Sequence, residues 1–395
     1  MENKKKNKND KILSFLEDPK RLGILIPIMA ILLSLVACGI LILCLGKNPL
    51  EAYTNLLQGS GFLPKKSYPA HKNMLTDLAS FMNAWTPMLF ASLAVSVAMK
   101  TGLFNIGVSG QMLIAGFITS ISIGYSDLNP FLAKPLVIVV GALVGALAGG
   151  LIGWCKYKFN INEVVSSIML NYIFQYVISF FINTRFINPV SRQSDPVSRE
   201  SRLTFMEQVV GDMKIDIPLG IILAVIVAFI IHFLLNRTVT GYEMKAVGAN
   251  RTAAKYAGIS IGKNMILSMI ISGGLAGLAG VTYYMGYFGS IQPNVLTTVG
   301  FDAIAVALLA NNNAIGVIFS SLLVTIVSKG STYMSSSTGL ESEIALVITG
   351  FMLLFSACVF YMRHKVELAV ENAREKERES DRITVADVNS KGGTK

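Results

Sequence analysis

The residues best suited to chemistry in this chain are polar groups that interrupt apolar segments. Asn105 and Gln111 lie in TGLFNIGVSGQMLIAGF, residues 101–117, together with four glycines. An amide can bind an uncharged polar solute, because it both donates and accepts hydrogen bonds. Lipid cannot satisfy such groups, and irregular backbone at membrane depth is tolerated only inside protein or beside a water-filled cavity. We therefore expect Asn105 and Gln111 to line a translocation pathway, whereas their glycine neighbours fit a pathway or close helix packing equally well.

Two other segments carry similar groups. Asn171 and Tyr172 begin the run NYIFQY, which places amides beside aromatic rings, and Phe301 and Asp302 lie in GFDAI. All four are candidates for the same pathway. Aromatic residues at helical spacing are also ordinary packing residues, so both interpretations stay open for Tyr172. The run GALVGALAGG, residues 141–150, is expected to serve helix packing.

The sequence contains no group of residues typical of an enzyme. Its three histidines and four cysteines are far apart, without a CxxC pair or metal-ligand spacing. GISIGKN, residues 258–264, resembles a phosphate-binding loop, but it is one residue short between its glycines and has Asn264 where Ser or Thr should bind Mg²⁺. We expect no catalytic residue, metal or cofactor. Any ATP that drives this chain must be hydrolysed by another chain.

Composition places these residues in a membrane protein. The 395 residues are 52% hydrophobic and 15% charged, with a mean hydropathy of +0.56, which is too apolar for a soluble globular protein. A helix needs about 20 apolar residues to cross a bilayer. The eighth apolar segment hides two helices, because Asn311, Asn312 and Asn313 suit a turn better than a lipid-facing helix. The sequence therefore predicts an all-α polytopic protein of about ten transmembrane helices, from apolar segments at 22–45, 81–99, 104–125, 135–155, 164–184, 217–235, 264–285, 300–327 and 343–361.

The positions of Lys and Arg indicate how these helices cross the membrane. With both termini cytoplasmic, most of the 34 basic residues fall on the inner side. A basic tail at 1–21 and a charged tail at 362–395 would then face anionic lipid headgroups, so the net charge of +10 requires no nucleic-acid partner. We expect a multi-pass transmembrane domain over 22–361 in the cytoplasmic membrane, with outer loops at 46–80 and 185–216.

The order of the segments also predicts an inverted repeat. Residues 81–184 form four helices that begin by running inward, and residues 264–361 form four that begin by running outward. Each half has a glycine-bounded break at a matching place, at Asn105 and at Asp302. Matching breaks in two halves are the sequence feature that best indicates a translocation pathway.

The inner segment at 236–264 is too long for a plain connector. Its centre, EMKAVGANRTAAKYAG, predicts a short helix, a turn at Gly248 and a second short helix. A structured cytoplasmic loop suits docking of a soluble partner. The alternative is an amphipathic helix that lies on the membrane surface.

Four motifs in order carry a resemblance to a known family: TGLFNIGVSGQMLIAGF, NEVVSSIMLNYI, GYEMKAVGANRTAAKYAGI and GFDAIAVALLANNNAIGVIFSS. They closely resemble permease subunits of bacterial ATP-binding-cassette (ABC) importers, in the branched-chain-amino-acid and ribose permease superfamily. Within it they are most similar to nucleoside permeases that depend on basic-membrane-protein-type lipoproteins. The resemblance covers about residues 80–361. The chain departs from the family pattern at two places. The family usually has an acidic residue at the position of Ser109 and often a basic residue in the loop Asn311–Asn313. These differences affect the prediction of the ligand more than the prediction of a transport role.

The resemblance implies a transport subunit, not an enzyme, with several partners. It would pair with a second homologous permease subunit, receive a nucleoside from an extracellular substrate-binding lipoprotein and be driven by a cytoplasmic ABC ATPase. The element that enters the ATPase would comprise Glu243, Gly248, Ala249, Asn250 and Arg251.

Three alternative functions fit some of the same features. The ligand of such a permease could be a simple sugar such as ribose. A stand-alone secondary transporter would also show an inverted repeat, but should carry buried acids or histidines for ion coupling. A membrane-embedded enzyme would need convergent catalytic groups.

The outer segment at 185–216 is a candidate docking surface for the lipoprotein, because it is the most charged external stretch. A solvated loop is the alternative. The charges in question are those of Arg192, Arg199, Arg202, Asp195 and Glu200.

Overall fold

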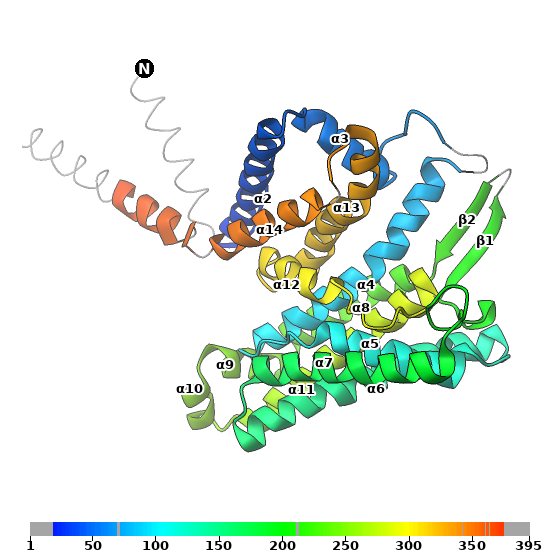
Figure 1. The fold of residues 1–395 in the computed structure, drawn as a ribbon. Coiled ribbons are helices and arrows are strands. Elements are labelled where there is room, and N and C mark those ends of the chain that lie inside the picture. The colour runs from blue at the N-terminus through cyan, green and yellow to red at the C-terminus, as the bar shows by residue number, and fades with distance from the viewer. Residues whose placement is uncertain are drawn as a thin grey trace, which may run out of the picture. The chain divides into compact units, whose positions relative to one another are not determined.

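The computed structural model describes residues 19–68, 72–210, 213–341, 343–359, 361–362 and 364–374, so most of the two predicted tails lies outside it. Over the described residues the chain is almost entirely helical (Figure 1). Seven of these helices are long and apolar enough to cross a membrane, and three shorter apolar helices accompany them. They correspond one for one with the ten predicted helices. The all-α polytopic fold is thereby confirmed.

The elements follow the predicted segments closely. Contacts divide the chain into two compact units, Met1–Ala37 with Phe351–Lys395, and Cys38–Gly350. In chain order the elements are α2 Pro19–Cys44, α3 Pro49–Gly59, α4 Met74–Lys100, α5 Val108–Thr119, η1 Ser120–Gly124, α6 Pro130–Phe159, α7 Glu163–Phe181, η2 Ile182–Phe186, η3 Arg199–Ser201, β1 Thr204–Val210, β2 Met213–Pro218, α8 Gly220–Arg237, α9 Val239–Ala249, α10 Arg251–Tyr256, α11 Ile261–Val281, η4 Thr282–Phe288, α12 Val299–Leu309, α13 Ala314–Thr338 and α14 Ile344–Ala357.

Helices α4 and α11 form the centre of the larger unit. Their most apolar stretches are 83% and 72% buried, against 28% for α7 and for α8. Helix α4 contacts α11, α12 and α13, while α11 contacts α4, α5 and α6. Each central helix is the first of its predicted repeat and contacts the second and third helices of the other. The two predicted halves therefore contact each other in the same way.

Glycines let α6 and α11 run side by side (Figure 1). A side chain at Gly145 would collide with the backbone of Gly273 and Gly277, and one at Gly149 with the backbone of Met269. Without side chains at these positions the two backbones approach closely, which is how van der Waals packing joins helices in lipid. The packing role predicted for GALVGALAGG is confirmed.

The two predicted breaks produce short helices. Helix α12 has 11 residues, about 16 Å at 1.5 Å per residue, which is roughly half of the hydrocarbon core. Helix α5 has 12 residues before the wider π-helical turns of η1. The predicted asparagine turn follows α12: Asn311 and Asn312 have φ of 50° and 54°, a left-handed conformation that asparagine tolerates, and Asn313 caps α13.

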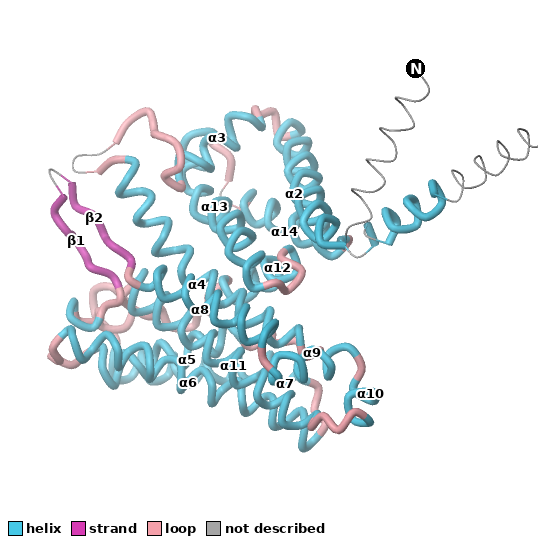
Figure 2. Tube along the Cα trace, turned by 180° about the vertical axis from the view of Figure 1, so that it is seen from behind, coloured by secondary structure: helices cyan, strands magenta, loops and turns pink. Residues whose placement is uncertain are grey.

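The predicted outer loops contain regular structure that the sequence did not indicate. Helix α3 packs on α13, where a side chain at Gly59 would meet the backbone of Gly330. Helix α4 begins at Met74 rather than at residue 81, because Asn73 and Thr76 form a capping box. In the second loop, β1 and β2 form an antiparallel pair, and β2 runs beside α4 (Figure 2).

In the smaller unit, one face of α2 is buried by the end of the chain. Leu22, Ile26 and Ala30 recur every four residues and so lie on one side of the helix. They pack with Val359, and Met362 lies against the same cluster.

Candidate functional site

The break before α5 is held by a closed set of hydrogen bonds. Asn105 Nδ2 donates to Gln111 Oε1 (3.0 Å) and to Ser272 Oγ (2.9 Å) on α11. Asn105 Oδ1 accepts from the backbone N of Gly107 (3.0 Å) and from Gln111 Nε2 (3.2 Å). Ser272 Oγ donates in turn to the carbonyl of Ala94 on α4 (2.7 Å). The structure thus brings the two predicted amides together, fully buried, as a brace between α4, α5 and α11.

Asn171 braces the same break from α7. Its Oδ1 accepts from the backbone N of Gly110 (2.9 Å), and its Nδ2 donates to the carbonyl of Ile106 (3.1 Å). The N–H of Gly110 is one of those that a helix start leaves without an internal partner. A side chain at Gly110 would collide with Asn171. Asn171 therefore supplies the hydrogen bonds that the interrupted helix lacks.

The other predicted pathway residues do not join this network. Tyr172 is 51% exposed in the isolated chain and stacks on Tyr176, with ring centroids 6.5 Å apart. Phe301 is exposed, and Asp302 is half-buried in the first turn of α12, where a carboxylate favours the helix N-terminus. The predicted pathway residues thus fall into a buried brace and separate partly exposed positions.

Three adjacent cavities surround η4, with volumes of about 100, 230 and 320 Å³. Phe288 lines all three, Tyr283 lines the two smaller ones and Tyr287 the two larger ones. The ring centroids of Tyr283 and Tyr287 lie 4.8 and 4.7 Å from that of Phe288. Sequence reasoning missed this site. The aromatic run TYYMGYF, at the end of a glycine-rich span, was the available signal.

The middle cavity combines these rings with hydroxyl groups. Its polar lining is Thr298, Thr325, Ser328 and Thr332, with Lys329 at the boundary to the largest cavity. Aromatic faces with a few converging polar groups are typical of a small-molecule site.

The largest cavity carries charge. Lys329 Nζ donates to Tyr287 Oη (2.7 Å), and Arg202 Nη2 donates to the carbonyl of Gly286 (3.1 Å). Asp216 lines the same cavity. Burial lowers the pKa of Arg202 and the Asp216 carboxylate opposes that shift, so the guanidinium stays charged at neutral pH.

Arg202 therefore does not belong with the other arginines of the outer segment. Arg192 and Arg199 are exposed, as a docking surface requires, whereas Arg202 is half-buried. Its guanidinium lies where a side chain on Gly289 would be, and Gly289 has φ +80°. The buried Nε of Arg202 has no hydrogen-bond partner among the described residues.

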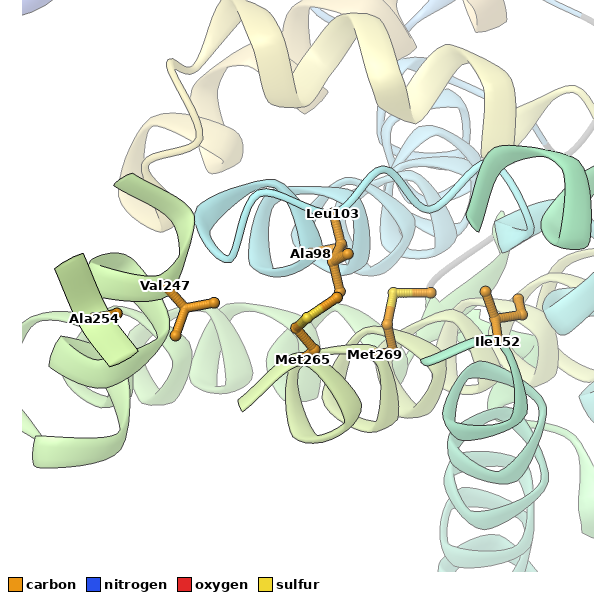
Figure 3. Close-up of a cluster of buried hydrophobic side chains, with 7 residues drawn as sticks. All are labelled: Ala98, Leu103, Ile152, Val247, Ala254, Met265 and Met269. Atoms are coloured by element: carbon orange, nitrogen blue, oxygen red, sulfur yellow. The ribbon is translucent and has the colours of Figure 1, made fainter. Parts of the chain in front are cut away.

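The inner segment folds as α9 and α10 against the transmembrane helices. Val247 of α9 and Ala254 of α10 enter a buried apolar cluster with residues of α4, α6 and α11 (Figure 3). Burial of these side chains fixes the segment to the body of the protein. The full cluster is Ala98, Leu103, Ile152, Val247, Ala254, Met265 and Met269.

The turn in this segment lies at Asn250, so the predicted turn at Gly248 was wrong. Helix α9 continues through Gly248 to Ala249, and the Asn250 side chain caps α10 by accepting from the N–H of Ala253 (3.0 Å). Gly248 is not among the residues with positive φ. A side chain there would instead collide with the carbonyl of Lys100, so the glycine permits contact with the break.

The remaining predicted coupling residues form two groups. Glu243 Oε2 accepts from Asn264 Nδ2 (2.9 Å), and Arg251 Nη2 donates to the carbonyl of Gly102 (3.2 Å), so both contact their own chain. Ala249 and Asn250 are exposed. Tyr256 on α10, which sequence reasoning did not single out, is 89% exposed.

A helical membrane protein with a braced break, an aromatic cavity and an anchored inner segment is of the transporter class. The chain belongs to the family described as the branched-chain amino acid transport system permease component, which it matches over residues 78–357. Permease components of ABC transporters are transport subunits rather than enzymes, and they act with an ATPase and a substrate-binding partner. The family membership predicted from the four motifs is confirmed.

Several relatives align with this chain over most of their length. The nucleoside ABC transporter permease protein NupB of Lactococcus lactis subsp. cremoris is 33% identical over 347 residues, 85% of this chain and 91% of that protein. The guanosine ABC transporter permease protein NupP of Bacillus subtilis is 34% identical over 352 residues, 87% and 96% of the two chains. The glucose ABC transporter permease protein of Haloferax volcanii is 25% identical over 354 residues, 87% and 90%. No solved structure matches the chain.

Proposed function

We propose that this chain is the membrane-spanning permease subunit of an ABC importer for nucleosides. The observation that carries the proposal is the pair of larger cavities around η4, which share Tyr287 and Phe288. A nucleobase can stack on such rings, and ribose hydroxyls can bond with hydroxyl side chains such as Thr298 and Ser328. The names of the relatives that are 33% and 34% identical support this substrate class.

Transport requires the braced break to open. In the proposed orientation, with both termini cytoplasmic, the cavities at η4 lie toward the outer face and the break lies farther in. The amides of Asn105, Gln111 and Asn171 hold the break closed by bonding with each other and with its backbone. They would contact the solute only after α5 separates from α7 and α11. We therefore propose that these amides line the pathway in that open conformation.

The proposed ATPase contact is the exposed surface of α10 with the turn before it. Ala249, Asn250 and Tyr256 are available to the partner. Gly248 and Arg251 connect this surface to the break, because both contact Gly102. A displacement of α10 by the ATPase would therefore reach the break through Gly102.

The remaining partners fit other surfaces. The exposed apolar face of α7, with Tyr172 and Tyr176, would face membrane lipid or the second homologous permease subunit. Arg192 and Arg199 remain candidates for docking an extracellular substrate-binding lipoprotein. Charge reversal at both should slow substrate delivery in a salt-dependent way.

The function is tested by uptake of radiolabelled nucleosides into cells that contain the whole transporter and lack other nucleoside uptake. We expect uptake that is lost when the partner ATPase is inactivated while the proton gradient is intact. Uptake that persists without ATP hydrolysis would instead indicate a secondary transporter. Absence of nucleoside uptake by an intact complex would refute the proposed substrate class.

A simple sugar is the second candidate substrate. The four hydroxyl side chains of the middle cavity also suit a sugar, and the Haloferax volcanii relative is named for glucose. Competition distinguishes the two, because excess ribose or glucose should leave nucleoside uptake unchanged if the nucleoside is the substrate.

A further inference from the structure

The largest cavity at η4 is lined by more charged side chains than stacking of a base and binding of a ribose require. We propose that it is a subsite that selects oxopurine nucleosides, in which Lys329 and Arg202 donate hydrogen bonds to the acceptor edge of the base. The proposal rests on the proposed nucleoside function and adds to it a preference among bases. The juxtaposition that carries it is two cations, one carboxylate and two aromatic rings around one cavity of about 320 Å³.

Both cations have donors to spare. A lysine ammonium has three N–H donors, and Tyr287 Oη accepts from Lys329 Nζ at 2.7 Å, which leaves capacity for a ligand. Arg202, which also lines the cavity, uses Nη2 on the carbonyl of Gly286, and a guanidinium has five N–H donors. Both side chains line this cavity, so an acceptor brought into it can bond with donors of both.

The acceptor edge of an oxopurine matches these donors. Its O6 and N7 atoms are adjacent acceptors, and Arg or Lys donating to them is the commonest base-specific contact in nucleic-acid recognition. Adenine presents an N6 donor beside N7, so two cationic donors would face one donor and one acceptor. The Asp216 carboxylate, which also lines the cavity, can accept from a base N–H.

Because two of the cavities share the same aromatic rings, the base and the sugar of one nucleoside can lie in different cavities. Tyr287, Phe288 and Lys329 line both the charged cavity and the hydroxyl-lined one. The two rings are nearly perpendicular, so a base would stack on one of them. With its acceptor edge toward Lys329, it would leave its ribose near Thr298 and Ser328. One nucleoside can thus use both cavities at once.

The test compares uptake of guanosine, inosine and adenosine by the whole transporter carrying Lys329→Met. The lipoprotein is the same in every arm, so a changed ratio must come from the permease. We expect the ratio of guanosine and inosine uptake to adenosine uptake to fall about tenfold, since one such base contact discriminates by roughly 5- to 150-fold. Lys329→Arg, which keeps a cationic donor, should restore the ratio.

The matched control is Lys134→Met. Lys134 lies near the expected outer end of α6, where its Nζ is 3.7 Å from the ring centroid of Phe205, and it lines none of the three cavities. This variant removes the same charge and should leave the ratio unchanged. Membrane abundance of every variant is measured by immunoblot.

Three outcomes would overturn the subsite. Lys329→Met could lower uptake of all nucleosides equally, which would indicate a structural role. It could also leave the uptake of every nucleoside unchanged. Competition of guanosine uptake by inorganic phosphate or a nucleoside monophosphate that vanishes in Lys329→Met would make the cavity an anion site instead. Failure of the proposed function itself looks different, because the unmodified transporter would then take up none of the nucleosides.

Discussion

At the scale of single residues, the decisive question is whether a buried polar group has a partner. The sequence identified Asn105 and Gln111 as groups that lipid could not satisfy, and Asn171 as a further pathway candidate. It could not reveal that their partners are one another, Ser272 and the backbone of the break. Those contacts depend on how α5, α7 and α11 pack, which residue types in one segment do not encode. The same limit hid the partners of Arg202.

Replacement of Asn105 distinguishes two roles of its side chain, which are to hold the break closed and to contact the solute. Asn105→Ala leaves the N–H of Gly107 and the amide of Gln111 without their partner, and each buried group left unpaired costs about 1–3 kcal/mol. We expect a lower melting temperature for the detergent-solubilised protein, with an unchanged preference among nucleosides in whatever uptake remains.

A matched control for this prediction is Ser122→Ala. Ser122 Oγ bonds only with carbonyls of its own helical turn, at Ile118 and Thr119, and the residue is exposed. Its melting temperature should match that of the unmodified protein. A stable Asn105→Ala protein with altered substrate preference would show that the amide contacts the solute and not mainly the break.

At the scale of elements, apolar segments and turns were predictable, and the contacts between elements were not. The Asn311–Asn313 turn followed from the preference of asparagine for left-handed backbone. Gly248 was misjudged because a glycine can serve a positive φ or a close approach, and only the neighbouring chain at Lys100 decides which. The strands β1 and β2 were missed, although MKIDIP alternates apolar and polar residues as a half-buried strand does.

Substitution of Gly248 should uncouple the inner segment from the break. In Gly248→Val the new side chain collides with the carbonyl of Lys100 and displaces α9. Core clashes of this kind cost about 1–3 kcal/mol, so we expect the protein to insert but to lose substrate-stimulated ATPase activity and uptake. Gly350→Val makes the same substitution in α14, where a Cβ would meet nothing within 4 Å, and should retain coupling. Normal coupling in Gly248→Val would exclude this connection.

The exposed face of α10 should affect coupling without affecting stability. Tyr256 is 89% exposed in the isolated chain, so Tyr256→Ala removes little internal packing. Aromatic side chains are frequent interface hot spots, and truncation of one costs roughly 2–4 kcal/mol of binding. We expect weaker ATPase association in pull-down and lower stimulated ATPase activity at an unchanged melting temperature. Tyr242→Ala, which removes another exposed tyrosine from α9, is the control; an equal loss in both variants would argue against a specific contact at Tyr256.

At the scale of the whole molecule, hydropathy was sufficient to predict the number of apolar helices. Over the described residues, seven are long enough to cross a membrane and three are shorter. Two of the short ones, at Val108–Gly124 and Val299–Leu309, adjoin the breaks at glycines and asparagines. The sequence also predicted that α4 and α11 begin the two repeats, but it did not predict that these two are the most buried of the seven long apolar helices. The cavities at η4 could not be predicted, since their walls come from α4, the outer segment, η4 and α13 together.

The orientation in the membrane can be measured at two exposed positions that lie on either side of one transmembrane helix. Val190 is 93% exposed in the segment before α8, and Tyr256 is 89% exposed after it, so one crossing separates them. In a background with Cys38, Cys44, Cys155 and Cys358 replaced by serine, we expect Val190→Cys to react with a membrane-impermeant maleimide in intact cells. Tyr256→Cys should react only after permeabilisation, because the basic inner segments remain in the cytoplasm. The reverse pattern would place both termini outside the cell, and labelling of both cysteines in intact cells would mean that α8 does not cross the membrane.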